Sequence, residues 1–537
     1  MVRAPTDRDH QEDPTATADT GTLRVVRHRS ARWPALVAVA LLVPLCAVYL
    51  WFPQDADGVL FEQGARRMAG GAVFYRDLWD IKQPGIYWVY QAGLALGIGV
   101  VGPRLLEIAL ALAGGWLVWA LTARWRLHPA VRVLAPVLVI GPYLLGTHRG
   151  GVLAIEGLAN PLLVLVFAAA WPAVPSGGPA RGPWSWAAAG AGAGVVGVLK
   201  LVYLPLPATL LLGALVASRL SWRGRALRAV AAAAGAAVPL GATAAYFAVH
   251  GVLRLAWVTT IDVPVESVTT VRFDAGYTRW AELLIEIVPL LGTLALAGVL
   301  GARRRGTVVR EVTLLAVVGE AIALAFQQYP TPYRMLVIIA PLALVAVAGV
   351  DTVWRRAAAA ARPRVRVWAL LLVAFLALPL ARGPQRIVFA AAAVPSWGLG
   401  QDQRNPRDAV LVGQRPQDDV GPMRDLVRPG EAIYVFGVPQ LYQELHAREA
   451  VEITGWASTL MPDRVWRERD RQLVRSRPRL VFVDGSIAEA VQAGSPRFVQ
   501  VLATDYTVVA VTPNGRWFRT DRPGTPSGVP GDNELAS

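Results

Sequence analysis

The chain has 537 residues, of which 54% are hydrophobic and 17% are charged, and its mean hydropathy is +0.41. Soluble globular proteins have about 45–50% apolar and about 25% charged residues, so this composition excludes a soluble globular chain and a disordered one. The formal net charge is +15, but residues 401–537 hold 17 Arg against 18 Asp and Glu. The positive excess therefore belongs to the apolar part of the chain, where loop charges set membrane orientation, and no nucleic-acid partner is expected.

The first 32 residues are polar and predict a disordered cytoplasmic N-terminus. Residues 33–52 are an apolar run without a signal-peptide cleavage pattern, so they predict an uncleaved first membrane span. The single cysteine, Cys46, lies in this run, which excludes an intrachain disulfide. Further spans are expected at 104–121, 131–147, 152–171, 184–199, 201–218, 228–249, 283–301, 311–326, 334–353 and 366–381. Residues 33–381 thus predict a polytopic α-helical membrane module of about 11 transmembrane helices with a first outer loop at 53–103.

Segment 86–101 decides the topology, because counting it as a span inverts every segment that follows it. Without it, the basic N-terminus and four Arg-rich loops all lie on the cytoplasmic side, and these loops are 122–132, 219–228, 302–310 and 355–366. The positive-inside rule is then obeyed throughout. We therefore expect the N-terminus inside, 86–101 as a helix along the outer interface, and everything after residue 381 outside.

Beyond the spans, the periodicity changes to short elements of a soluble domain. Residues 382–429 are expected to form a linker, and 430–520 an extracytoplasmic α/β domain. Its apolar runs of strand length are 432–437, 480–485 and 506–511, and helical patterning lies at 438–448 and 463–477. Residues 521–537 are rich in Pro, Gly and Ser and predict a disordered tail. No cluster of acid, base and nucleophile is found in this domain, so we expect an accessory role for it.

The first outer loop carries a dense set of polar and aromatic residues. Asp57 lies five residues past the first span, so its carboxylate is expected at the membrane surface, within reach of a lipid headgroup and a water-soluble substrate. Downstream come Ala65-Arg66-Arg67, then Gly70-Gly71, then Tyr-Arg-Asp-Leu-Trp-Asp-Ile-Lys-Gln-Pro-Gly-Ile-Tyr at 75–87. Such a loop beside a membrane is typical of a binding site, and solvation of the loop by its charges is the alternative.

These residues resemble the first loop of GT-C glycosyltransferases. The similar branch contains dolichyl-phosphate-mannose protein mannosyltransferases, lipid A aminoarabinose transferases and rhizobial galacturonosyltransferase-like proteins. The resemblance implies transfer of a sugar from a polyprenyl-phosphate carrier to an acceptor on the outer face. It implies Asp57 as the catalytic base, with Asp55 as the alternative. The family usually has a second acidic residue at the outer start of a later span, and Glu156 has that place; capping of the helix start is its alternative role.

Lysine usage gives an independent indication of a carrier-phosphate site. Lys82 and Lys200 are the only lysines among 53 basic residues, and the expected topology places both at the outer face. An ammonium group binds a phosphate as a point charge, and interfacial anchoring is the alternative role of Lys200. The other candidates for binding the donor and its phosphate are Arg76, Asp77, Asp80, Tyr87, Tyr333 and Arg334. No cofactor is required; the carboxylates are compatible with a divalent metal, but their spacing does not demand one.

We therefore expect an inverting, mannosyltransferase-like glycosyltransferase that is multi-pass in the plasma membrane, with its C-terminal domain extracytoplasmic. Its expected partners are a polyprenyl-phosphate-linked sugar donor, a cell-envelope glycan, lipid or protein as acceptor, and the lipid bilayer. Asp57 would accept the proton of the acceptor hydroxyl while basic side chains neutralise the departing phosphate. The alternative is a transporter or flippase for a lipid-linked saccharide, a class that often has inverted repeats; no internal repeat is evident in the sequence.

Overall fold

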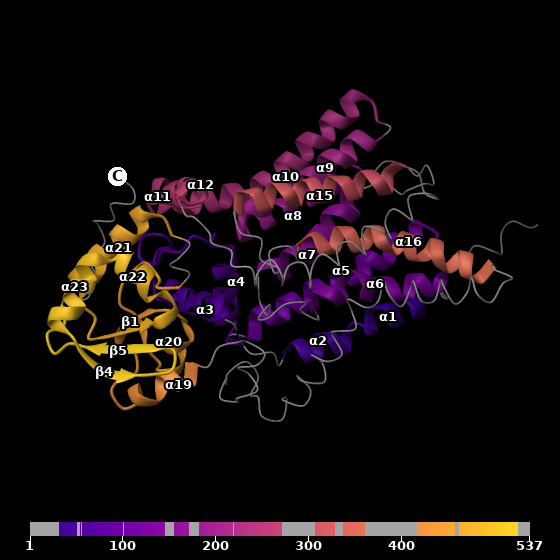
Figure 1. Cartoon of the computed structure of the whole chain (residues 1–537). Helices are drawn as coiled ribbons and strands as arrows, with labels where there is room; N and C mark the ends of the chain where they lie inside the picture. The colour runs from indigo at the N-terminus through magenta and orange to yellow at the C-terminus, as the bar shows by residue number, and fades with distance from the viewer. Residues whose placement is uncertain are drawn as a thin grey trace, which may run out of the picture.

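The structure is a computed structural model and describes residues 32–50, 54, 56–99, 101–144, 155–170, 182–218, 220–270, 307–327, 337–359, 416–456 and 461–524. Its helices form a long bundle, and an α/β domain lies at one end of that bundle (Figure 1). We call residues 416–524 the outer domain. The helices of the bundle are α1 (Arg32–Ala40), α2 (Val43–Leu50), α3 (Ala56–Ala69), α4 (Gly85–Ala95), α5 (Val101–Arg124), α6 (Pro129–Leu144), α7 (Ile155–Ala170), α8 (Pro183–Leu199), α9 (Pro205–Ala217), α10 (Trp222–Val249), α11 (Leu253–Trp257), α12 (Val263–Thr270), α15 (Thr307–Gln327) and α16 (Ile339–Ala359), with a 3-10 turn η1 (Leu201–Tyr203) and a π-helical turn η2 (Val258–Asp262).

The expected first span, 33–52, is divided into two helices. α1 ends at Ala40 and α2 begins at Val43. Pro44 has no amide hydrogen, so it cannot donate to the carbonyl of Ala40, and the helical hydrogen-bond ladder is interrupted there. Both pieces pack on α6, so the break does not detach the segment from the bundle.

Some of the described helices have the length of a membrane span. Among the described helices, α5 and α10 are long and apolar enough to cross a bilayer, and shorter apolar stretches lie at Pro34–Ala47, Pro129–Gly141, Ile155–Ala169, Leu201–Ala217 and Leu314–Ala325. α4 has 11 residues, so it is about 16 Å long and too short for a hydrocarbon core of about 30 Å. That length agrees with a helix along the interface. The expected spans 283–301 and 366–381 lie outside the described residues.

Small residues bring α8 and α10 together backbone to backbone. A Cβ atom at Gly190 would lie 1.9 Å from the carbonyl oxygen of Ala232, and one at Gly235 would lie 2.0 Å from that of Ala187. Contacts of this kind are typical of helices that associate in a bilayer. They fix α8, whose C-terminal end leads directly into Lys200.

The first outer loop is a folded unit with its own aromatic core. The Phe61 and Tyr87 rings pack edge to face with centroids 5.3 Å apart, and Phe74 lies 4.7 Å from Tyr87. A Cβ atom at Gly64 would lie 2.3 Å from the Tyr87 ring, so only glycine fits there. The core ties α3 to α4 and thereby fixes the segment between them, which carries Asp80 and Lys82.

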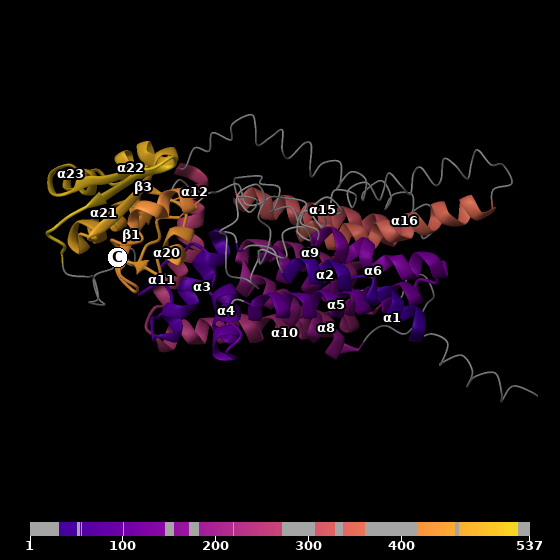
Figure 2. The same cartoon turned by 90° about the horizontal axis from the view of Figure 1, so that it is seen from below.

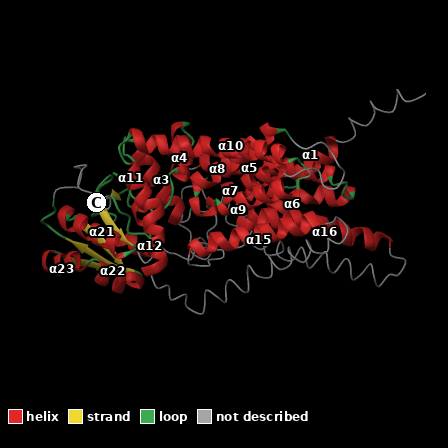
Figure 3. Ribbon diagram, turned by 90° about the horizontal axis from the view of Figure 1, so that it is seen from above, coloured by secondary structure: helices red, strands yellow, loops and turns green. Residues whose placement is uncertain are grey.

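The outer domain contains a mixed five-stranded sheet in the order β2-β1-β3-β5-β4. The strands are β1 (Ala432–Phe436), β2 (Arg448–Glu449), β3 (Leu480–Asp484), β4 (Thr507–Val511) and β5 (Gly515–Arg519). β2, β1 and β3 are parallel, whereas β5 pairs antiparallel with β3 and β4. The helices are α19 (Pro416–Val420), α20 (Gln440–Glu444), α21 (Asp463–Ser476), α22 (Ala488–Gly494) and α23 (Pro496–Asp505), with 3-10 turns η6 (Gly421–Met423) and η8 (Gly485–Ile487). An α/β domain is thus confirmed at this end of the chain, and Figure 3 shows its strands in yellow beside the helical bundle.

The outer domain begins within the stretch that was expected to be a linker. Val420, Met423 and Val427 are buried in one hydrophobic cluster with residues of β1, β3 and β5. The Trp517 indole donates to the carbonyl of Asp419 at 2.8 Å, which fastens α19 to the sheet. Residues 416–429 of the expected linker 382–429 thus contribute to the core of the domain, and residues 382–415 lie outside the described residues.

Candidate functional site

The outer domain docks on the first outer loop. The Trp79 amide donates to the carbonyl of Glu452 at 2.9 Å, and Trp79 pairs with Ile453 as an isolated parallel bridge. Arg464 forms an ion pair with Glu266 of α12 at 2.7 Å, which adds a second point of attachment. In Figure 2, as in Figure 1, α3, α11 and α12 lie beside this domain. The outer domain therefore contacts both the first outer loop and α12.

Asp57 stands at this junction, in the first turn of α3. Its Oδ1 accepts a hydrogen bond from the Trp456 indole at 2.7 Å and lies 3.3 Å from Lys82 Nζ. Lys82 Nζ lies 3.6 Å from Asp80 Oδ2, which also accepts a 2.6 Å hydrogen bond from the Tyr87 hydroxyl. The structure therefore brings together four of the predicted site residues, Asp57, Asp80, Lys82 and Tyr87, and adds Trp456 to them.

Opposing influences set the protonation of Asp57. Burial acts to raise the pKa of its carboxyl, but the Lys82 ammonium, the hydrogen bonds from Trp456 and Lys82 and the more distant Lys200 together hold that pKa below its usual range. The side chain retains 32% of its exposed surface. Asp57 is therefore a charged carboxylate at neutral pH that remains open to solvent and to a ligand.

A second lysine–carboxylate pair lies at the start of α7. Lys200 Nζ lies 3.2 Å from Glu156 Oε1 and donates to the Tyr203 hydroxyl at 2.8 Å, and that hydroxyl donates in turn to Glu156. Gln83 of the first loop accepts a hydrogen bond from the Leu201 amide at 3.0 Å. This bond joins the loop to the corner between α8 and α9, so the two pairs belong to one continuous polar region.

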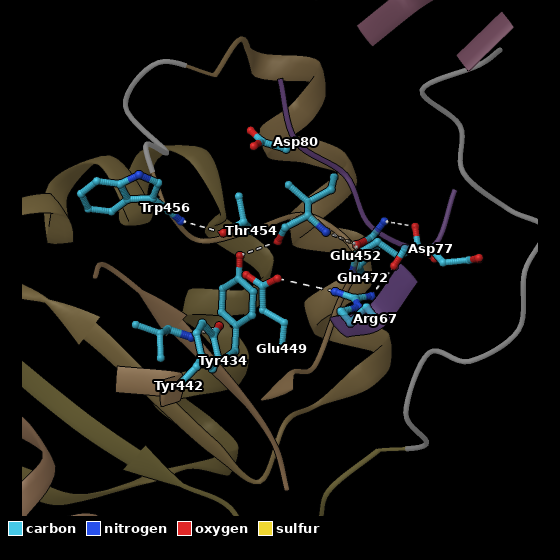
Figure 4. A network of polar contacts seen from close by, with 12 residues as sticks. Arg67, Asp77, Asp80, Tyr434, Tyr442, Glu449, Glu452, Thr454, Trp456 and Gln472 are labelled. Carbon is cyan, nitrogen blue, oxygen red and sulfur yellow. Dashed lines mark hydrogen bonds and ion pairs between the residues drawn. The ribbon is translucent and has the colours of Figure 1, made fainter. Parts of the chain in front are cut away.

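Arg76 and Asp77 lie in a different network, which faces the outer domain. Asp77 Oδ2 accepts from the Val73 amide at 2.7 Å, and its carboxylate pairs with Arg76 at 3.1 Å. Arg67 donates to the Asp77 carbonyl and lies 3.6 Å from Glu449 of β2 (Figure 4). Asp77 thus stabilises the conformation of the loop. In the described contacts, Arg76 pairs with Asp77 and not with Asp57.

The interface also buries two carboxyl groups of the outer domain. Burial raises the pKa of Glu449 to about 7 against the opposing charge of Arg67. Burial, followed by the negative charges of Glu468 and Asp77, raises the pKa of Glu452 to about 7. Folding is therefore coupled to protonation of these two carboxyl groups near neutral pH.

Three predicted site residues, Asp55, Tyr333 and Arg334, lie outside the described residues. Trp456 was not predicted. It follows a glycine in a loop of the outer domain, and such a position is not distinguished by spacing or by residue type. The outer domain reaches Asp57 directly through Trp456, and its accessory role remains a prediction. Among the described residues, no group of three His, Cys, Asp or Glu is placed to hold a metal ion.

Solved structures share this fold over most of the chain. The crystal structure of apo ArnT from Cupriavidus metallidurans matches with a TM-score of 0.53 at 16% identity and covers 91% of this chain and 98% of ArnT. ArnT bound to undecaprenyl phosphate gives a TM-score of 0.53 at 15% identity with the same coverage. The cryo-EM structure of arabinofuranosyltransferase AftD from Mycobacteria has a TM-score of 0.48 at 16% identity and covers 92% of this chain and 40% of AftD. No protein-family model and no curated protein matches the sequence.

The likeness to ArnT confirms the coarse fold, a helical bundle followed by an α/β domain. Like ArnT, this chain is mostly helical, and its C-terminal part carries a mixed α/β sheet. At 16% identity the likeness concerns the fold and not the residues of a site. The number of transmembrane helices and their orientation remain predictions.

Proposed function

We propose that the protein is an inverting membrane glycosyltransferase that moves a sugar from a polyprenyl-phosphate carrier to an acceptor in the cell envelope. The observation that carries the proposal is the pairing of Asp57 with Lys82 at the start of α3, within the fold of ArnT, which binds undecaprenyl phosphate. A carboxylate beside an ammonium group supplies both a base and a cation for a phosphate.

The reaction assigns a role to each side chain. Asp57 accepts the proton of the acceptor hydroxyl while that oxygen bonds to the anomeric carbon. The bond from the anomeric carbon to the phosphate oxygen breaks, its electron pair leaves with the polyprenyl phosphate, and attack opposite the leaving group inverts the configuration. Lys82 and Lys200 neutralise the growing negative charge, an effect of about 10²–10³-fold per donor group in other enzymes.

The proposal places the site at the outer face of the plasma membrane. The N-terminus is cytoplasmic, α4 lies along the outer interface, and the outer domain is extracytoplasmic. The Arg-rich loops support this orientation through the positive-inside rule. Reporter fusions after residues 126 and 400 test this orientation. The first fusion is expected to read inside and the second outside. The opposite result for either fusion would contradict a site at the outer face.

The direct test uses purified protein in lipid nanodiscs with radiolabelled undecaprenyl-phosphate sugars and a cell-envelope extract. Label is expected to move from carrier to acceptor, and Asp57→Asn is expected to abolish the transfer. In proteoliposomes, movement of intact carrier-linked sugar across the membrane without transfer would identify a transporter and overturn the proposal. A parallel reaction with EDTA measures whether a divalent metal contributes.

A further inference from the structure

The loop that presents Trp456 is held firmly within the outer domain. The three consecutive carbonyls of residues 452–454 accept hydrogen bonds from the Trp79 amide at 2.9 Å, the Tyr434 hydroxyl at 2.9 Å and the Arg469 guanidinium at 3.3 Å. A Cβ atom at Gly455 would lie 1.9 Å from a carbonyl oxygen of β1, so the loop lies directly on the sheet. Trp456 therefore projects from a rigid support and not from a mobile turn.

The same loop is joined to α3 at a second point. The carboxylate of Glu449 accepts hydrogen bonds from the Thr454 hydroxyl and the Gly455 amide, and it pairs with Arg67 of α3 at 3.6 Å. Figure 4 shows Arg67, Glu449, Thr454 and Trp456 along this path. Because α3 also carries Asp57, the outer domain contacts that helix near both of its ends.

We propose that Trp456 of the outer domain is a positioning residue for Asp57, holding one carboxylate oxygen through its indole N–H and leaving the other to accept the proton. Both described hydrogen bonds, from Trp456 and from Lys82, end on Oδ1. In this proposal Oδ2 is the oxygen that accepts the proton of the acceptor hydroxyl. The inference rests on the proposed role of Asp57 as the base.

A neutral donor is suited to this position, because it orients a carboxylate without adding charge. The charged and titratable groups that bear on Asp57 are Lys82 of the loop, Lys200 at the corner after α8 and Tyr87 of α4, while Asp80 shares Lys82. A hydrogen bond to a carboxylate stabilises its charged form, and it does so less at a partly exposed site. Removal of the indole N–H is therefore expected to raise the pKa of Asp57 by about half to one unit.

The test compares Trp456→Phe, which keeps the ring and removes the N–H, with the wild type and with Trp517→Phe. The control also loses an indole N–H in the outer domain, but that group donates to a backbone carbonyl and not to a carboxylate. The protonated form of Asp57 is measured by carbodiimide labelling between pH 2 and 8, with quantification of the modified peptide by mass spectrometry. The labelling midpoint is expected to rise by about half to one pH unit in Trp456→Phe and to stay unchanged in Trp517→Phe.

A second measurement separates positioning from a merely structural contribution. Because the base must be ionised, the acidic limb of the kcat/KM profile is expected to move to higher pH together with the labelling midpoint. A fall in activity with neither midpoint nor limb displaced would overturn the inference. A shifted midpoint in a protein that transfers no sugar would refute the proposed function and leave the contact between Trp456 and Asp57 established.

Thr454→Val provides a variant of nearly equal shape should Trp456→Phe fail to fold. The Thr454 hydroxyl accepts a hydrogen bond from the Trp456 amide at 3.2 Å, so its loss loosens the support without touching the indole. The midpoint and the acidic limb are then expected to move in the same direction by a smaller amount. An unchanged midpoint in this variant would also count against the inference.

Discussion

Two lysine–carboxylate pairs lie in the candidate site. They differ in the exposure of the carboxylate and in the group that gives it a further hydrogen bond. The Asp57–Lys82 and Glu156–Lys200 distances are 3.3 Å and 3.2 Å, and the two lysines have nearly the same exposure, 17% and 16%. The two carboxylates differ in exposure: Asp57 retains 32% of its side-chain surface and Glu156 only 3%. Asp57 receives its further hydrogen bond from another domain, whereas Glu156 receives its own from Tyr203, three residues after Lys200.

This difference in exposure indicates different roles for the two carboxylates. Glu156, Lys200 and Tyr203 form a closed triangle in which each group bonds to the other two, so the carboxylate serves to hold the ammonium group in place. Asp57 stays open to solvent, as the proposed base must be. Proximity to the membrane surface is thus insufficient to make a carboxylate a base; the base must also be accessible to the hydroxyl that it deprotonates.

The largest effect is expected from exchanging the two carboxylates for amides. Asp57→Asn should reduce sugar transfer by about 10²–10⁴-fold, because an amide cannot accept the proton. Glu156→Gln should cost about tenfold, since it acts only through Lys200. Initial rates of labelled transfer in nanodiscs measure both. A larger loss in Glu156→Gln than in Asp57→Asn would make the buried carboxylate the base.

Asp57 and its loop partners could be predicted from the sequence because they lie close together along it. Asp57, Asp80, Lys82 and Tyr87 all fall within residues 57–87, and their types and spacing resemble a known loop. Trp456 lies 399 positions from Asp57. Only the docking of the outer domain brings the two together, and local pattern carries no information on docking.

The fold shows the same division between local and distant information. β1 and β3 were predicted from apolar runs that end in glycine, because a buried parallel strand is apolar on both faces. β5 was missed: Arg516 and Arg519 flank Trp517 and Phe518, and this short mixed pattern is not distinctive. Its place follows from pairing with β3, which buries Trp517 in the core. The break at Pro44, in contrast, is local, and proline alone could have predicted it.

The two lysines sharpen the comparison further. Lys82→Met and Lys200→Met should each lower transfer by about 10²-fold, because each removes a cation from the leaving phosphate. They should differ in pH dependence. Lys82 lowers the pKa of Asp57 more than Lys200 does, so the acidic limb of kcat/KM should move to higher pH mainly in Lys82→Met.

The matched controls are Lys82→Arg and Lys200→Arg, which keep the charge and change its shape. They should retain the position of the acidic limb while losing part of the rate. Equal displacement of the limb in the two Met variants would mean that both ammonium groups act on Asp57 alike, and the distinction between the open and the closed pair would fail.

A smaller effect, on thermal stability, should follow from Glu452→Gln. Glu452 lies where the outer domain contacts the first outer loop. The pKa of Glu452 is about 7 in the folded protein against 4.5 for an ordinary glutamate. Folding therefore favours its protonated form, and the resulting stability is complete below the unfolded pKa and is lost as pH rises through about 7. Glutamine resembles the protonated form and can still accept the hydrogen bond from Gln472. A gain of about 1 kcal/mol at pH 8 corresponds to a Tm higher by about 2–4 °C.

Thermal unfolding in detergent at pH 5 and pH 8 measures this effect. The advantage of the variant should be small at pH 5, which is close to the unfolded pKa of 4.5, and much larger at pH 8. Glu489→Gln, on the exposed surface of α22, is the matched control and should change Tm at neither pH. A Glu452→Gln variant that is less stable at pH 8 would show that the ionised carboxylate strengthens the docking.

The smallest effect is expected at Arg76, a basic residue that the sequence offered as a ligand of the carrier phosphate. Its side chain is 38% exposed and pairs with the adjacent Asp77, and an ion pair of this kind contributes about 0–1 kcal/mol. Arg76→Ala should therefore change transfer by less than about threefold and leave the acidic limb in place, because Arg76 is bonded to the loop network and not to Asp57. Arg76→Lys, which keeps the charge, should be indistinguishable from it. A loss of transfer in Arg76→Ala as large as in Lys82→Met, restored by Arg76→Lys, would show that the carrier phosphate extends to this side of the loop, and the site would then span both networks.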